Sequence, residues 1–358
     1  MSRYAYGNNP DKVKNYEAFW QRSPAKRPMV AFSLKGWFPI GEIGSTKSWK
    51  LHSFLTPEMV DPVSLAAEQA ELLKEGEVMA DDVFRGDSPT QGVRWLPGML
   101  GVQQCVLEGN ISEEAEHRTW DELANIGLDK GNAWFKKYIE FFDVLREQAK
   151  GRYPVGHATM HGPSDLAFML RGHDTSVMDL FDEPEKSMNL LARLNLFLDA
   201  VTKEGFKHVD EFCGGYFDPQ YHLWAPGPIK RLQEDATALY SPKLYRAFLQ
   251  PLDRELAGKY PYNVMHLHST SMYILEDFLE ISKIKSFEIN LDVAADLKAM
   301  LPYYQKVQAN KKPLIVRGSF SPDDLRLLVD TLEPTGLYLV IMVKNIREME
   351  ELRPLLGM

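Results

Sequence analysis

The feature that most constrains the fold is a strand–helix–strand unit that spans Asn263–Asn290. It begins with a short apolar run ending at His268 and continues, after a Ser-Thr-Ser turn, into apolar residues at helical spacing. A second apolar run, Ser286–Asn290, closes the unit. This pattern predicts two parallel strands joined by a crossover helix, because parallel strands need a long connection between them.

The same alternation continues to the end of the chain. Predicted strands at Pro313–Gly318 and Gly336–Val343 each precede a predicted helix. Earlier strands are expected at four further apolar runs, Met29–Leu34, Val78–Phe84, Tyr153–Thr159 and His208–Cys213. We therefore predict an α/β protein, a single (β/α)8 TIM barrel over residues 1–358 with an irregular insertion around residues 85–131. A doubly wound open sheet is the alternative, but the chain lacks the glycine-rich phosphate loop of that class.

Length and composition fit one large barrel, since 44% of the 358 residues are hydrophobic and 25% are charged. A formal net charge of −9 argues against a nucleic-acid partner, which would need a basic face. The two cysteines, Cys105 and Cys213, exclude a disulfide framework and suit a reducing compartment. No leader-like segment is evident, and no run approaches the roughly 20 apolar residues of a membrane helix. We expect a cytoplasmic protein without a membrane partner.

Two pairs of polar residues lie at strand ends of the opening unit. His266 and His268 alternate with apolar residues, so both imidazoles face the same side of their strand. If that side is the barrel interior, they could bind a metal ion or act as an acid–base group and its orienter; if it is the exterior, they pack against helices. Glu288 and Asn290 alternate in the same way on the next strand. His268 is the favoured functional residue, because it is nearer the strand end.

Other candidates follow the remaining predicted strands. Asp81 and Asp82 are adjacent, so only one of them can face the interior, where a carboxylate could stabilise a cationic group; both could instead be solvated loop acids. Glu211 lies in a short apolar run and must be paired, bound to a ligand or directed to water. His157 and His161 flank one turn, where a histidine is either functional or a hydrogen-bonded loop residue.

A last group could bind substrate. Arg317 precedes a glycine at a strand end, where a guanidinium could hold a carboxylate or a phosphate with two hydrogen bonds, or pair with a nearby acid. Tyr221, His222 and Trp224 belong to an aromatic loop. That loop could cover a flat or apolar substrate, or equally pack on the protein's own surface.

Several motifs, in a fixed order, resemble those of the uroporphyrinogen decarboxylase superfamily. They are the run ending at Asp82, Leu96-Pro97-Gly98, Gly162-Pro163-Ser164, Gln233-Glu234-Asp235 with Ser241-Pro242, His268-Ser269-Thr270-Ser271 and Arg317-Gly318. This superfamily also contains corrinoid-dependent methyltransferases. The resemblance extends from about Arg27 to the end of the chain and implies a (β/α)8 barrel.

The departures from the family pattern favour its methyltransferase branch. The segment Lys35–Gly44 has none of the arginines that bind porphyrinogen carboxylates in the decarboxylases, and the family's substrate-side tyrosine is Phe168 here. The similar thiol methyltransferases hold zinc with one histidine and two cysteines. Here the histidine is His268, and the cysteine positions fall near Thr270 and Val343. A thiolate zinc site is thus excluded.

A softer expectation is that His268 binds zinc together with Glu211 and Glu288, although nothing in the sequence requires the metal. The leading hypothesis is a methyltransferase that demethylates a small methylated substrate, aromatic or aliphatic, toward a corrinoid carried by a partner protein. The expected catalytic residues are Asp82, Glu211, His268 and Glu288, and the expected substrate-binding residues are His157, Tyr221, His222, Trp224 and Arg317.

Two alternatives remain open. One is a metal-free decarboxylase or lyase for a small non-porphyrin acid, in which Asp82 stabilises a cation and Arg317 holds a carboxylate. The other is a non-catalytic ligand-binding barrel. The expected partners are a small molecule and a corrinoid protein, and the chain could also form a homodimer.

Overall fold

A six-stranded parallel sheet forms the centre of the molecule, in the spatial order β1-β10-β9-β8-β7-β6. Its strands are β1 (Met29–Ser33), β6 (Ile229–Gln233), β7 (Tyr262–Leu267), β8 (Ser286–Asn290), β9 (Leu314–Gly318) and β10 (Leu337–Met342). The computed structural model describes residues 4–34, 39–293 and 295–358. Part of the predicted arginine-free segment Lys35–Gly44, residues 35–38, therefore lies outside the described residues.

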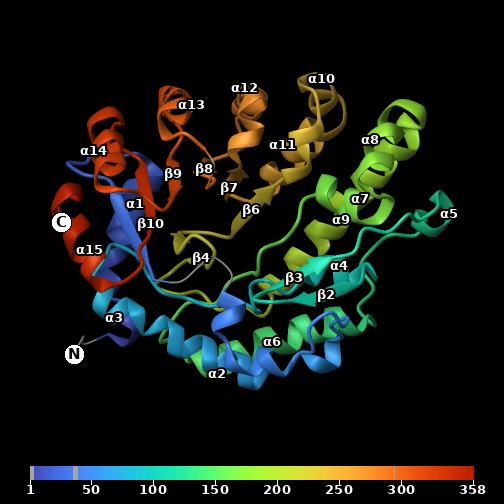
Figure 1. The fold of residues 1–358 in the computed structure, drawn as a ribbon, viewed down its shortest axis with the longest axis horizontal. Coiled ribbons are helices and arrows are strands. Elements are labelled where there is room, and N and C mark those ends of the chain that lie inside the picture. Colours follow the sequence, from blue (N-terminus) through green and yellow to red (C-terminus); the bar gives the residue numbers. More distant parts are fainter. Residues whose placement is uncertain (1–3, 35–38, 294) are drawn as a thin grey trace.

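Helices cover the outer side of the sheet. Figure 1 shows α11, α12, α13 and α14 outside strands β6 to β9, with α2 and α6 at the opposite side of the molecule. The helix bounds are α1 Val13–Gln21, α2 Pro62–Leu73, α3 Glu75–Met79, α4 Trp95–Met99, α5 Trp120–Leu123, α6 Ala133–Ala149, α7 Pro163–Arg171, α8 His173–Asp182, α9 Pro184–Phe206, α10 Pro242–Leu244, α11 Gln250–Lys259, α12 Leu275–Leu279, α13 Leu297–Ala309, α14 Pro322–Thr331 and α15 Ile346–Leu352. Over the described ranges, none of these helices combines the length and apolarity that a membrane span requires.

Strand and helix alternation from β7 onward is confirmed. The predicted crossover unit forms β7, α12 and β8, and the later strands and helices fall within a residue or two of their predicted bounds at most ends. Helix α14 begins after the N-cap residue Ser321. The Ser321 hydroxyl accepts a hydrogen bond from the N–H of Asp324, and the Asp324 carboxylate accepts one from the N–H of Ser321.

Three predicted strands of the first half do not form. In place of Val78–Phe84, helix α3 ends at Met79, and the next two carboxylates bind the edge of β1: Phe32 N donates to Asp81 Oδ2 and Val30 N to Asp82 Oδ2, both at 2.9 Å. Side-chain acceptors thus take over the role of backbone carbonyls. The predicted strands Tyr153–Thr159 and His208–Cys213 are reduced to single bridges, Asp87–Val155 and Phe212–Gly215.

Two of these irregular segments, around Asp82 and around Pro154, nevertheless continue the backbone hydrogen bonding from the edge strand β1. Asp82 N donates to Val30 O at 3.1 Å, and Asp87 N donates to Pro154 O at 2.9 Å. The arrangement is consistent with a TIM-barrel-like fold in which six positions are regular strands. Closure by eight strands stays a prediction.

The insertion expected around residues 85–131 is a small, mostly irregular excursion. It contains α4, α5 and an antiparallel hairpin of β2 (Gln104–Leu107) and β3 (Asn110–Glu113). A second short hairpin pairs β4 (Tyr216–Asp218) with β5 (Leu223–Ala225) just before β6.

Side chains of the sheet alternate between two environments, as the pleat requires. The outward positions join the large core under the helices: Phe32, Leu232, Met265, Phe287, Val316 and Leu339. The inward positions near the amino ends of the strands form a second apolar cluster: Ala31, Ile229, Val264, Ile315 and Tyr338. Further along β6 to β9, the inward positions are polar, namely Arg231, His266, Glu288 and Arg317, whereas Val340 of β10 stays apolar. The sheet thus has an apolar floor and a polar layer at its carboxyl end.

Candidate functional site

An open cavity of about 580 Å³ lies at the carboxyl ends of the parallel strands. Strands β7, β8 and β9 contribute His266, Asn290 and Arg317 to its lining, and Phe168 and Leu239, from outside the sheet, also line it. This is the end at which α/β barrels bind substrates, because the loops there are free to vary around a rigid sheet. The cavity is therefore the candidate functional site.

Two histidines and one aspartate converge in the cavity. His266 Nε2 and His268 Nε2 are 3.1 Å apart. The carboxylate of Asp235, just after β6, lies 3.9 Å from His266 Nε2 and 3.8 Å from His268 Nε2. One ligand atom from each residue falls within 4.8 Å of the others, which is the spacing that a shared metal ion needs. We call Asp235, His266 and His268 the histidine cluster.

The other ring nitrogen of each histidine faces a carboxylate. His266 Nδ1 contacts Glu288 Oε2, and His268 Nδ1 lies 2.7 Å from Asp292 Oδ1. An ionised carboxylate only accepts hydrogen bonds, so each Nδ1 carries a proton, and in a neutral ring Nε2 then presents a lone pair. Carboxylates that fix histidine tautomers in this way typically surround metal sites.

Both of these carboxylates are themselves held. Burial alone would raise the pKa of Glu288, but the charge of Arg317, with Nε 2.8 Å from Oε1, and the hydrogen bond from His266 outweigh burial and hold that pKa at about 2. Asp292 accepts from Ser269 N at 2.9 Å and from Asn290 Nδ2 at 2.6 Å. Against its partial burial, hydrogen bonds from Ser269 and His268 lower its pKa to about 2. Both groups are anionic at neutral pH.

The structure brings together part of the expected ligand set. His268 lies in the cavity, and His266, which was ranked below it, lies beside it. Glu288 is adjacent, but its oxygens contact His266 and Arg317 and it orients a ligand rather than serving as one. Glu211 is exposed and does not line the cavity, because the strand expected to carry it does not form.

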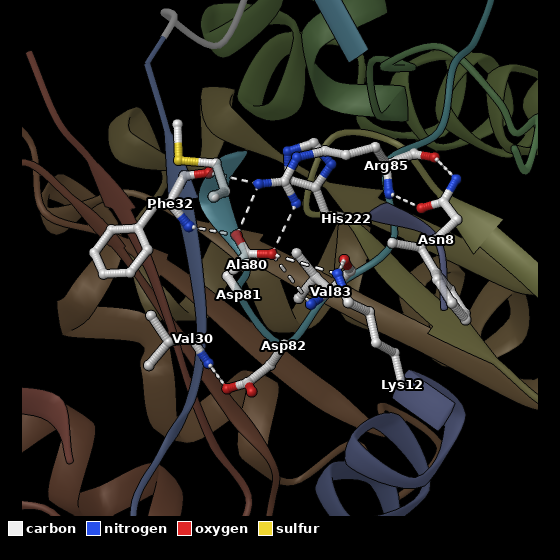
Figure 2. Close-up of polar contacts among 12 residues, drawn as sticks. Asn8, Lys12, Val30, Phe32, Ala80, Asp81, Asp82, Val83, Arg85 and His222 are labelled. Carbon is white, nitrogen blue, oxygen red and sulfur yellow. Dashed lines mark hydrogen bonds and ion pairs between the residues drawn. The ribbon is translucent and has the colours of Figure 1, made fainter. Parts of the chain in front are cut away.

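Asp82 lies elsewhere. Its carboxylate accepts from Val30 N and receives Arg27 Nη1 at 2.6 Å and Nη2 at 2.8 Å. Figure 2 shows the carboxylate of Asp82 turned toward Val30, while that of Asp81 turns toward Arg85 and Phe32. Adjacent side chains thus point apart, as expected, but neither lines the cavity. Asp82 ties β1 to the segment that precedes it.

His157 points into the helical layer. Its ring packs edge-on against Phe142 and Phe206, and Nδ1 lies 3.2 Å from the hydroxyl of Tyr138. Burial lowers its pKa to about 3, so the ring is neutral. Of the two histidines at this turn, His161 is the one that lines the cavity.

The aromatic loop lies under the site instead of covering it. Trp224 donates from Nε1 to Phe212 O at 2.7 Å and is buried in the apolar floor, together with Tyr221. Tyr221 touches the polar layer, since its hydroxyl accepts from Arg231 Nε at 2.6 Å. His222 lines a separate, smaller cavity of about 110 Å³.

Sequence reasoning missed three residues of the site. Asp292 lies two residues after β8, so the rule that picked out strand ends could have found it by extending each strand end by two residues; Asp235 follows β6, which was not predicted as a strand. Arg231 was missed because Ile229–Gln233 carries adjacent charges, Lys230 and Arg231, and was not predicted as a strand. Only the structure shows that these two side chains face opposite sides.

No protein-family model and no curated protein sequence matches the chain. Among solved structures, the fold is similar to that of a methyltransferase from Methanosarcina mazei, with a TM-score of 0.62 and 13% sequence identity over 99% of each chain. At this identity the similarity establishes the α/β fold along the whole chain. It is consistent with the TIM-barrel prediction.

Proposed function

We propose that the protein is a metal-assisted methyltransferase that removes a methyl group from a small substrate in the cavity and passes it to a corrinoid carried by a partner protein. The observation that supports this proposal is the convergence of His266 Nε2, His268 Nε2 and Asp235 in a cavity of about 580 Å³. The fold similarity to a methyltransferase and the sequence resemblance point the same way.

The histidine cluster fits a divalent ion by its own chemistry. Two imidazole lone pairs 3.1 Å apart repel each other unless a proton or a cation lies between them. Two histidines and one carboxylate suit zinc and leave a coordination position open. Zinc held there would supply a Lewis acid toward the oxygen, nitrogen or sulfur atom from which the methyl group departs.

The remaining residues position the ligands and supply protons. Glu288 and Asp292 hold the imidazoles in the tautomer that leaves Nε2 free. Burial and the neighbouring Asp235 carboxylate raise the pKa of Asp165, which also lines the cavity, so this group carries a proton at a pH where most aspartates do not. Asp165 is thus a candidate proton donor for the atom that loses its methyl group.

The proposal is tested by incubating zinc-loaded protein with reduced cobalamin and a panel of methylated alcohols, amines, thioethers and methoxybenzoates, and following methylcobalamin by absorbance. We expect formation with at least one class, and at least a 100-fold loss of rate in His266→Ala, since that change removes a ligand. A folded protein that binds no metal and methylates no cobalamin would refute the proposal. Release of carbon dioxide from the methoxybenzoates of this panel would instead favour the decarboxylase alternative.

A further inference from the structure

The polar layer contains one buried cation without a carboxylate partner. Among the described residues, three arginines are buried: Arg85 at 0%, Arg317 at 4% and Arg231 at 8% exposure. Arg85 pairs with Asp81 at 2.7 Å, and Arg317 pairs with Glu288 at 2.8 Å. Arg231 has no carboxylate oxygen within 4.0 Å in the part of the chain that the structure describes. The carboxylates of Asp218, Asp235 and Glu288 act on this guanidinium through space, but among the described residues none of them forms an ion pair with it, so its hydrogen-bonding edge is buried without an anionic partner in contact.

The hydrogen bonds of Arg231 fix its orientation but do not neutralise it. Nε donates to the hydroxyl of Tyr221 at 2.6 Å, and Nη1 donates to Oε1 of Gln233. Both acceptors are neutral. Within the described residues, Nη2 makes no hydrogen bond, and Arg231 lines the cavity. A guanidinium held on one edge and open on the other is prepared to bind a ligand without first reorganising.

A chain of hydrogen bonds links Arg231 to the histidine cluster. Gln233, which accepts from Arg231, donates in turn to Asp235 Oδ2. The guanidinium carbons of Arg231 and Arg317 lie 5.6 and 5.4 Å from the centre of the same Tyr221 ring. Glu288 forms its ion pair with Arg317 and acts on Arg231 only through space.

Apolar and aromatic side chains form part of the cavity lining. Phe168, Met169 and Leu239 belong to it, and the ring of Phe168 lies 5.2 Å from that of His173. A ligand that fills the space would therefore have an anionic end and an apolar body. A carboxylate matches a guanidinium in planarity and can accept two parallel hydrogen bonds from it.

We propose that the substrate of this site is a small carboxylic acid with an apolar body, and that Arg231 binds its carboxylate. This inference rests on the proposed function for the reaction, but recognition of the acid can be measured by binding alone. Arg231 is assigned as a specificity-determining residue that holds the substrate next to the histidine cluster.

The test compares acids with their neutral isosteres. Calorimetric titrations of zinc-reconstituted protein would use acetate, benzoate and 4-methoxybenzoate against acetamide, benzamide and 4-methoxybenzamide, with 4-methoxybenzenesulfonate to distinguish a carboxylate from another oxyanion. We expect at least one acid to bind about 10- to 100-fold more tightly than its amide, the range for a charge-assisted hydrogen bond. The sulfonate should bind more weakly than the matching acid.

The variants assign the preference to one residue. Arg231→Gln should remove the preference for the acid while changing affinity for the amide little. Arg94→Gln is the matched control, because Arg94 also lines the cavity but pairs with Glu113 at 3.0 Å, so the preference should survive there. Should Arg231→Gln fail to fold, Arg231→Lys keeps the charge without the planar fork and should give an intermediate preference.

Equal affinity of the native protein for every acid and its amide, or binding of neither, would overturn the inference, as would a preference that persists in folded Arg231→Gln. These outcomes are independent of turnover. A clear preference for the acid without methyl transfer would refute the proposed reaction and leave the assignment of Arg231 standing.

Discussion

Two clusters of charged side chains lie in the interior of this fold, and they differ in how completely their groups are satisfied. At the β1 side, the Asp81 cluster consists of Lys12, Asp81 and Arg85. Asp81 accepts from Arg85 Nη2 at 2.7 Å and from Phe32 N at 2.9 Å, and Lys12 Nζ lies 3.7 Å from its other oxygen (Figure 2). Opposite charges meet there directly.

In the histidine cluster, three acceptor atoms face one another instead. The Nε2 atoms of His266 and His268 face each other and the carboxylate of Asp235, whose Oδ2 accepts a hydrogen bond from Gln233. The comparison teaches that a buried charge cluster is not evidence of function by itself. What distinguishes the two is whether like groups converge, which demands a ligand, or unlike groups pair, which stabilises the fold.

The largest expected effect comes from breaking the closed cluster. Asp81→Asn leaves the fully buried guanidinium of Arg85 without its closest anion, so the free energy of unfolding should fall by about 3–5 kcal/mol. Urea denaturation measures this loss. Asp323→Asn, which breaks an exposed pair with Arg326, is the control and should change stability little. Equal effects of the two changes would mean that Asp81 has no structural role.

A second prediction concerns acid. The pKa of Glu288 is depressed to about 2 in the folded protein from an ordinary value near 4.5, so this carboxylate contributes stability above pH 4.5 that is lost as the pH falls toward 2. The contribution is about 3 kcal/mol. The difference in unfolding free energy between native protein and Glu288→Gln should therefore shrink as the pH is lowered from 5 to 2. A constant difference across this range would contradict the assignment.

A smaller effect should follow from loosening one ligand of the histidine cluster. Asp292→Asn keeps the shape of the side chain but no longer fixes His268 as a carboxylate does, so the dissociation constant for zinc should rise about 10- to 100-fold. Competition with a fluorescent chelator measures it. Asp296→Asn, at the N-cap of α13, is a nearby control that should leave zinc affinity unchanged. Unaltered affinity in Asp292→Asn would show that the tautomer of His268 is set otherwise.

The smallest effect is expected at a residue that the sequence favoured. Glu211 is exposed and lies outside the cavity, so Glu211→Gln should alter neither zinc affinity nor the unfolding temperature beyond experimental error. A tenfold loss of zinc affinity in this variant would mean that Glu211 reaches the site in another conformation.

How far the sequence could predict this molecule depends on which interactions form each part. From β7 onward, helices and strands follow hydrophobic periodicity, and alternation predicts which polar side chains share a face of each strand, such as Glu288 and Asn290. The segment before Asp82 could not be predicted in this way, because its apolar run ends in helix α3. Its carboxylates accept the hydrogen bonds of β1 that the backbone carbonyls of a neighbouring strand would otherwise accept.

The candidate site was predictable only in part for a similar reason. His268 is marked by its place at a strand end, but its partners Asp235 and Asp292 come from loops whose paths depend on tertiary contacts. Arg231 illustrates a further limit of prediction, since two adjacent cations such as Lys230 and Arg231 are typical of an exposed segment and do not indicate a buried strand. In the structure, Lys230 Nζ donates to Thr202 Oγ1 of helix α9 at 3.0 Å, whereas Arg231 lines the cavity.

The carboxylates of Asp81 and Asp82 have one more consequence, at the boundary of the regular sheet. Strand β1 is an edge strand, and an edge with free N–H groups can template the addition of a strand from another molecule. Here the N–H groups of Val30 and Phe32 are already engaged by acidic side chains. The same two residues that fasten the first strand therefore protect the protein against aggregation through that edge.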